Sequence, residues 1–146
     1  MVPRWVWPLA ARCAHELADV ATVRDLLALL DSYPPGHLAP MLRAERDLVR
    51  ARLAASDGDA VVADAFTAAI AGLREQSTPY HLAHGLLDHA EHLLAAGDAE
   101  PAVAAVDEAR DIAGRLGCQP LLDRADALNP RPSATATPQD SPRVAR

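Results

Sequence analysis

A row of polar side chains between residues 78 and 96 is the strongest candidate for chemistry in this 146-residue sequence. On a helix that turns by about 100° per residue, one side carries His81, His84, Asp88 and His92, with Glu91 beside them. Imidazole and carboxylate groups four residues apart can chelate a divalent metal ion. His84 and His92 would lie about 12 Å apart along the axis, so three of these ligands cannot reach one ion without a second helix. We therefore predict no metal site and no cofactor.

Two further interpretations of this row stay open. It can form a solvated polar face, which is the usual place for charged residues on a helix. It can also line a groove that receives a peptide, and histidines there would make binding sensitive to pH because they titrate near neutrality. A metal- or ligand-responsive module built on the same histidines is the alternative function that the row suggests.

Three arginines share one face of the helix that is predicted to begin near residue 40: Arg43, Arg46 and Arg50. Arginine binds phosphates and carboxylates through two parallel hydrogen bonds, so this face could engage a phosphate or an acidic peptide. Glu45 and Asp47 dilute the positive charge, and Asp47 lies four residues from Arg43, the spacing of an ordinary surface pair. The three arginines join His81, His84, Asp88 and His92 as candidate partner-binding residues.

No constellation typical of an enzyme is present. All fourteen basic residues are arginine, so the chain has no lysine for a P-loop, a Schiff base or a general base. The five serines fall in predicted turns or near the C-terminal end, and the carboxylates are spread along predicted helix surfaces. We expect a non-catalytic protein. Cys13 and Cys118 lie outside any metal-binding spacing and are expected to be small, buried apolar groups in a reducing compartment.

Charge and hydropathy narrow the environment. The formal net charge of −6 argues against a nucleic-acid partner or an anionic membrane surface. No apolar run reaches the length of a membrane-spanning helix. The apolar residues 5–9 are interrupted by Pro8 and Arg12 before a signal-peptide core develops. We expect a cytoplasmic protein.

The elements that must position these residues are helices. Residues 78–116, TPYHLAHGLLDHAEHLLAAGDAEPAVAAVDEARDIAGRL, predict two helices folded back on each other, with Gly97 as a left-handed stop and Asp98 as the cap of the second. Pro79 suits a first helical position after Ser77 or Thr78 as N-cap. No segment alternates with a period of two, so we predict no sheet. Further helices are expected at residues 9–17, 22–30, 40–55, 59–75 and 120–128.

The turn at Gly97 and Asp98 has counterparts at Gly58 and Ala18, so three similar turns are spaced about 40 residues apart. Each follows a small residue by seven positions and precedes apolar residues by five, nine and twelve positions. Phe66 is expected to fill the slot that Thr67 cannot. The positions concerned are Ala11, Ala51 and Ala90; Val23, Ala63 and Ala102; Leu27, Thr67 and Val106; and Leu30, Ile70 and Ala109. Small residues let the helices of a hairpin approach closely, and larger ones pack against the next hairpin.

This spacing resembles the tetratricopeptide repeat, stretched beyond its usual period of about 34 residues. We therefore predict an all-α fold of three helical hairpins in a right-handed superhelical stack, closed by the short helix at residues 120–128. The folded domain is expected to cover residues 1–128. Residues 129–146 are rich in proline, serine and threonine and are predicted to be a disordered tail. An unrelated helical bundle is the alternative.

Three segments carry a closer resemblance: LLALLDSYPPGHLAP, RARLAASDGDA and STPYHLAHGLLDHAEHLLAAGDAEPAVAAVDEARDIAGRLG. Over residues 9–128 the chain resembles the C-terminal repeat region of bacterial signalling ATPases. In these proteins tetratricopeptide-like repeats follow a P-loop ATPase core. Some carry an N-terminal adenylate or guanylate cyclase domain, and others carry a LuxR-type DNA-binding domain.

The chain departs from this family in lacking GxxxxGK[ST], cyclase-type strands and a basic recognition helix. The resemblance therefore implies the repeat module alone, and none of the relatives' activities carries over. The expected function is a non-catalytic module of a signal-transduction regulator that binds a protein or peptide, with an ATPase or cyclase domain among the candidate partners. A truncated remnant without an independent role is a further alternative.

Overall fold

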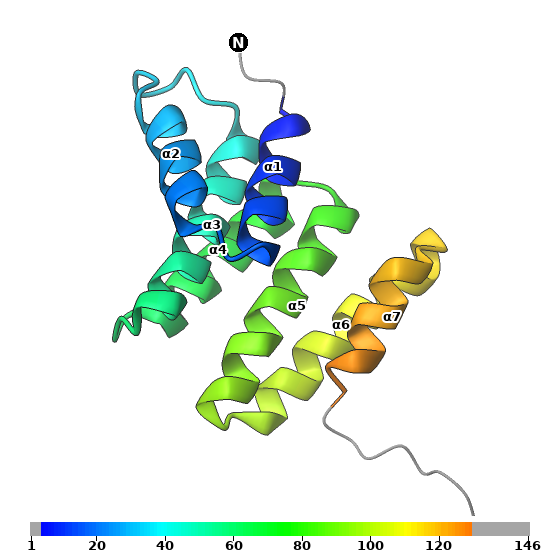
Figure 1. The fold of residues 1–146 in the computed structure, drawn as a ribbon. Helices are drawn as coiled ribbons and strands as arrows, with labels where there is room; N and C mark the ends of the chain where they lie inside the picture. The colour runs from blue at the N-terminus through cyan, green and yellow to red at the C-terminus, as the bar shows by residue number, and fades with distance from the viewer. Residues whose placement is uncertain (1–3, 130–146) are drawn as a thin grey trace, which may run out of the picture.

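The computed structural model describes residues 4–129, and its regular elements are all helices (Figure 1). The described residues contain no strand, so the all-α fold class is confirmed. The predicted disordered tail lies outside the described residues except for Asn129, and so do residues 1–3 of the predicted domain. The helices are α1 (Val6–Glu16), α2 (Val20–Asp31), α3 (Pro40–Asp57), α4 (Val62–Gln76), α5 (Pro79–Ala96), α6 (Ala99–Leu116) and α7 (Gln119–Ala127).

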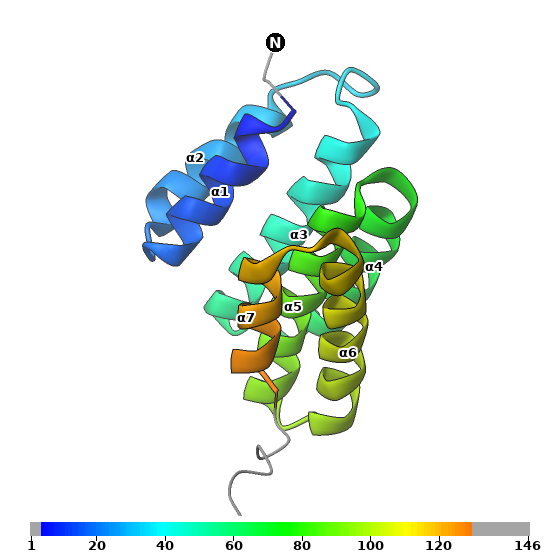
Figure 2. The same cartoon turned by 90° about the vertical axis from the view of Figure 1, so that its right-hand side faces the viewer.

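The helices pack in chain order. The helices of each successive pair, α1 and α2, α3 and α4, and α5 and α6, lie against each other, and α7 packs on both α6 and α5. Each even-numbered helix also contacts the next odd-numbered one. The odd-numbered helices touch in sequence, α1 on α3, α3 on α5 and α5 on α7, and we call these four the odd-helix layer (Figure 2).

Two apolar clusters form the core, and α3 contributes to both. Leu42 and Val49 of α3 pack with residues of α1 and α2, where the buried Trp7 donates a hydrogen bond from Nε1 to the carbonyl of Leu26 at 2.9 Å. Leu48 belongs to the larger cluster, which extends through α4, α5, α6 and α7. Because α3 has one face in each cluster, it joins the first hairpin to the rest of the molecule.

Four turns share one backbone geometry. Ala18, Gly58, Gly97 and Gly117 have positive φ angles of 55°, 74°, 87° and 63°. At each turn the next residue donates its N–H to the carbonyl five positions earlier, over 2.8–3.0 Å, which is the hydrogen bond of a Schellman motif. The left-handed stop predicted at Gly97 is therefore confirmed, and the two earlier turns match it.

The predicted caps are in part correct. The side chain of Thr78 accepts a hydrogen bond from the N–H of His81, as expected of an N-cap. Asp98 occupies the N-cap position of α6, but its side chain makes no capping hydrogen bond, so that part of the prediction is wrong. At the first turn Asp19 accepts from the N–H of Thr22 at 3.1 Å.

Two helix starts differ from the prediction by three residues, more than the others do. α1 begins at Val6 rather than near residue 9, and it contains Pro8 in its first turn. Proline is tolerated there because the first N–H groups of a helix have no intrahelical acceptor. α4 begins at Val62 rather than near residue 59, because Asp59 bonds its side chain to the N–H of Ala60 instead of capping a helix.

The repeat positions of the first and third hairpins are buried as predicted, but those of the second are shifted. The buried residues of α4 are Val62, Phe66, Ala69 and Leu73, and the first three lie one position before those expected. Ala63 and Thr67 are exposed. The expectation that Phe66 replaces Thr67 is thus confirmed, and its cause is a shift of the whole stripe. The small residues Ala11, Ala51 and Ala90 are all buried, which allows the close approach of helices expected there.

Within residues 4–129, no helix is both long and apolar enough to cross a membrane.

The left-handed turn at residue 18 predicts an unusual effect of glycine. Ala18→Gly should raise the free energy of unfolding by about 0.5–1 kcal/mol, because alanine is strained at positive φ and glycine is not. Urea unfolding followed by circular dichroism measures the change.

The matched control is Ala68→Gly, at an exposed position inside α4. It should lower the free energy of unfolding by about 1 kcal/mol, because glycine is a poor helix former. A loss of stability in both variants would contradict the assigned conformation of the first turn.

Candidate functional site

One buried carboxylate, that of Asp88 in the middle of α5, forms ion pairs with every other helix of the odd-helix layer. Its side chain is only 2% exposed. Arg12 of α1 donates to both carboxylate oxygens at 3.1 Å each, and Arg124 of α7 donates to Oδ1 at 2.6 Å. Arg52 of α3 lies with its Nε at 3.6 Å from Oδ2. Asp88 thus links α5 to each of the other three members of the layer.

Asp88 is charged because of these arginines. Burial on its own would raise the pKa of Asp88, but Arg12, Arg52 and Arg124, together with the hydrogen bonds from Arg12, hold it well below its ordinary value. Glu91, one turn further along α5, accepts a second hydrogen bond from Arg124 at 2.9 Å. Removing one partner of a buried ion pair commonly costs about 3–5 kcal/mol, so loss of the Asp88 carboxylate should be severe.

His84 lies one turn before Asp88 and also contacts Arg124. Its Nδ1 is 3.1 Å from Nη1 of Arg124. Since a guanidinium can only donate, Nδ1 accepts and the ring proton of the neutral form sits on Nε2. Burial, followed by the charges of Arg12 and Arg124, lowers the pKa of His84 to about 3. The expectation that this row titrates near neutrality is therefore wrong for His84.

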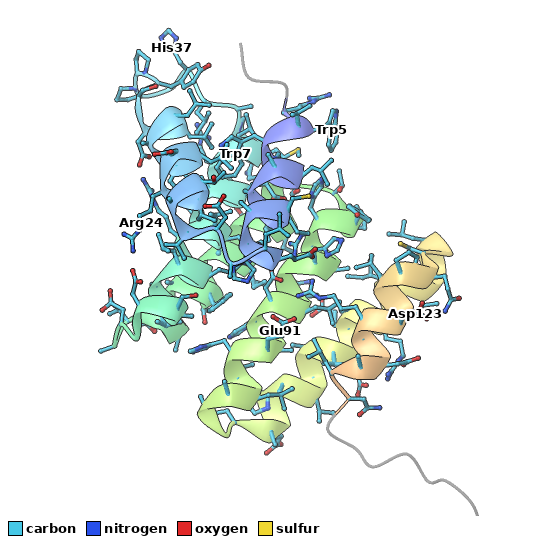
Figure 3. The ribbon with its side chains drawn as sticks, in the orientation of Figure 1. Trp5, Trp7, Arg24, His37, Glu91 and Asp123 are labelled. Atoms are coloured by element: carbon cyan, nitrogen blue, oxygen red, sulfur yellow. The ribbon has the colours of Figure 1, made fainter. Side chains whose placement is uncertain are left out.

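His81 lies at the end of the layer that carries the N-terminus of α1. Its ring stacks on Trp5 with centroids 5.7 Å apart, and Tyr80 meets it edge-on at 5.3 Å. Nδ1 of His81 is 3.1 Å from Oε1 of the buried Glu45, and the two form an ion pair when the imidazole is protonated. Together with Leu9 these residues line a cavity of about 380 Å³ between α1, α3 and α5. Figure 3 shows Trp5 at the start of α1.

The row predicted from the sequence does not converge on one point. His92 stacks on Phe66 of α4, with ring centroids 5.3 Å apart, while His84 and Asp88 contact the arginines. Among residues 4–129 no group of three or more histidine, cysteine, aspartate or glutamate side chains is arranged to hold a metal ion. The interpretation of the row as a solvated face is wrong for Asp88, which is buried at the centre of the molecule.

The arginine face of α3 is already occupied by contacts within the chain. Arg46 and Arg50 both approach Asp31 of α2, at 3.5 and 2.5 Å, and both also lie within 3.7 Å of Asp47. Arg43 donates to the carbonyl of Leu38 at 3.2 Å rather than pairing with Asp47 as the spacing suggested. These contacts are with α2, with α3 itself and with the loop before α3. They lie outside the group formed by Asp88, Arg12, Arg52, Arg124 and Glu91, which we call the Asp88 cluster.

The cysteines differ from the expectation. Cys13 is exposed and Cys118 is half-buried beside the larger apolar cluster, and both are free thiols. Neither lines the Asp88 cluster or the cavity at Trp5.

The sequence did not single out the partners of Asp88. Arg12 and Arg52 directly follow the buried residues Ala11 and Ala51, so they occupy equivalent positions in two hairpins. One residue further around the helix from a tightly packed alanine, they point into the odd-helix layer. The sequence could have indicated this contact, because the equivalent position in the third hairpin is Glu91, which carries the opposite charge. No such signal marks Arg124, which lies outside the three hairpins.

Comparison with known proteins finds no matching family model, no matching curated protein and no matching solved structure.

The lowered pKa of His84 predicts a pH dependence of stability. An unfolded chain binds a proton on this residue near pH 6.5, whereas the folded chain does so only near pH 3. The stabilisation is therefore complete above pH 6.5 and is lost as the pH falls below that value. The free energy of unfolding should decline by about 1–2 kcal/mol more between pH 6.5 and 4.5 in the native chain than in His84→Asn.

Chemical denaturation across that pH range measures the effect. Asparagine keeps a hydrogen-bond acceptor close to the position of Nδ1, which preserves the contact with Arg124. His37→Asn, at an exposed loop position, is the control and should follow the native pH profile. A His84→Asn profile as steep as the native one would show that His84 is not buried in its neutral form.

Proposed function

We propose that this chain is a non-catalytic, tetratricopeptide-like repeat module that holds a segment of a partner protein at the Trp5 end of the odd-helix layer. The proposal includes a role in signal transduction beside an ATPase or cyclase domain, which rests on the resemblance of residues 9–128 to the repeat region of signalling ATPases. The single observation that carries the binding role is the open apolar cavity formed by Trp5, Leu9 and Tyr80.

The packing pattern supports a repeat stack. Hairpins joined by the same left-handed turn lie in chain order, and each hairpin contacts the next through both of its helices. A stack of this kind presents one layer of helices along a continuous surface, which suits an extended partner segment. The third hairpin is capped by α7, which covers α5 and α6.

The cavity at Trp5 has the composition of a protein-binding site. Trp5, Leu9 and Tyr80 are exposed although they are large and apolar. Aromatic side chains around a pocket are typical of the residues that dominate protein interfaces, where a partner side chain fills the pocket and excludes water. The polar groups at its base, Glu45 and His81, are buried or half-buried and give the pocket a fixed floor.

The kind of anchor follows from the charges around the pocket. Arg12 lines it but is committed to Asp88. On the α3 face, Arg46 and Arg50 are committed to Asp31, and Arg43 donates to the carbonyl of Leu38. An apolar anchor side chain therefore fits better than the acidic segment that the arginine face alone suggested.

A displayed library of random peptides tests this binding role. Selection on the folded chain should enrich peptides with an aromatic or large aliphatic anchor, because such a side chain fills the cavity. Leu9→Glu and Tyr80→Glu should each weaken binding of the selected peptides by about tenfold or more, since a carboxylate would then face the apolar pocket. Titration with a fluorescent peptide measures the affinity.

Leu29→Glu is the matched control, because Leu29 of α2 is 44% exposed and Tyr80 is 45% exposed. It should leave the affinity unchanged. Failure to select any peptide, or peptides that bind Leu9→Glu and Tyr80→Glu as well as the native chain, would contradict the proposed surface.

A further inference from the structure

Arg52 differs from the other two arginines around Asp88 in having no hydrogen-bonded carboxylate. Arg12 takes both oxygens of Asp88, and Arg124 is bonded to both Asp88 and Glu91. The side chain of Arg52 is only 6% exposed, its Nε is buried without a hydrogen-bond partner, and its closest oxygen on Asp88 is 3.6 Å away. A buried guanidinium left in this state lacks the compensation that normally offsets its desolvation.

The charges near Arg52 leave positive charge in excess. Arg12, Arg52 and Arg124 carry three positive charges, and Asp88 and Glu91 carry two negative ones. The neighbouring His15 adds no further charge. Burial, and then the charge of Arg52, lower the pKa of His15, which keeps its ring neutral near pH 7. An anion would complete the cluster.

Arg52 faces space in which such an anion can sit. It lines a cavity of about 310 Å³ between α1, α2 and α3, and a second one of about 230 Å³ towards α5. The carboxylates of Asp88 and Glu91 line the second cavity, so the larger one suits an anion better. His15 and Ser56 line both cavities, so the imidazole of His15 lies beside the guanidinium where the two adjoin, while the hydroxyl of Ser56 donates to the carbonyl of Arg52 at 3.1 Å. Hydrogen bonds from a guanidinium and from an imidazole N–H are common means of binding a carboxylate.

The wall of the larger cavity indicates what kind of group the anion would carry. Apart from the polar groups at Arg52, its wall is formed by Val20, Val23, Val49 and Leu53. Asp19 lines it as well, but both oxygens of its carboxylate accept hydrogen bonds from Thr22. The volume lies at the lower end of the range for small-molecule sites, about 300–1,000 Å³.

We propose that this cavity binds a small organic acid, with its carboxylate on Arg52 and His15 and its short apolar chain against the valines and Leu53. The site is separate from the apolar pocket at Trp5. It lies where the first hairpin meets α3, so an occupant touches both the first hairpin and the Asp88 cluster, and it stabilises the folded chain in proportion to its affinity.

Hexanoate is the probe, and acetate and hexanol are its matched controls. Acetate has the charge without the chain, and hexanol has the chain without the charge. At constant ionic strength, hexanoate should raise the melting temperature of the native chain in a saturable way, and the controls should raise it much less. Methyl shifts of Val23, Val49 and Leu53 in nuclear magnetic resonance spectra should follow the same titration.

Arg52→Met tests the charged end. Asp88 keeps Arg12 and Arg124 as hydrogen-bonded partners in this variant, so the cluster is expected to survive. Affinity for hexanoate should fall by about tenfold or more, the usual effect of losing hydrogen bonds to a charged group. Arg24→Met, which removes an exposed arginine paired with Asp57, should bind hexanoate as the native chain does.

Val20→Phe tests the apolar end without touching the arginines, because the larger ring fills the cavity from its exposed edge. It should abolish the response to hexanoate. The proposal is overturned if hexanoate has no effect on the native chain, if hexanol acts as strongly as hexanoate, or if acetate does. It is also overturned if Arg52→Met and Val20→Phe both bind as the native chain does.

Discussion

A carboxylate removed from water must be matched by positive charge, and in this molecule that requirement determines how the helices of one layer meet. Asp88 sits in the middle of α5 with almost no solvent contact, and its partners come from α1, α3 and α7. Each arginine reaches the carboxylate only if its helix lies in the observed place. These ion pairs fix the positions of the helices more than they add net stability. The reason is that the desolvation of buried charges offsets much of their attraction.

The apolar core by itself does not impose this arrangement. The core is built mostly from alanine, leucine and valine, in two clusters that both include residues of α3, and apolar cores lose a unique packing before they lose stability. The Asp88 cluster connects the parts of the molecule that hold the two apolar clusters, because Arg12 belongs to the first hairpin and Arg124 to the last helix. Packing therefore provides most of the stability, and the buried ion pairs fix which helix faces which.

Much of the fold follows from local rules that a sequence displays directly. The left-handed stop at Gly97, the cap at Thr78 and the burial of Ala11, Ala51 and Ala90 depend on a few neighbouring residues, so spacing alone predicts them. The site was less predictable because its contacts join residues far apart in the chain. The row containing His84 and Asp88 was found, but its partners Arg12, Arg52 and Arg124 lie on three other helices. Whether a polar row faces water or the interior depends on the surrounding helices, and the sequence of one helix does not show where those helices lie.

If Asp88 holds α1 and α7 in the odd-helix layer, its loss should open these two helices first. Amide hydrogen exchange of Asp88→Asn, compared with the native chain, measures this, because exchange reports local opening helix by helix. Protection should fall most in α1 and α7 and least in α4 and α6, which do not contact Asp88 through a side-chain ion pair. Asp57→Asn, at an exposed pair, should leave all helices protected. Unchanged protection of α1 and α7 in Asp88→Asn would contradict the claim.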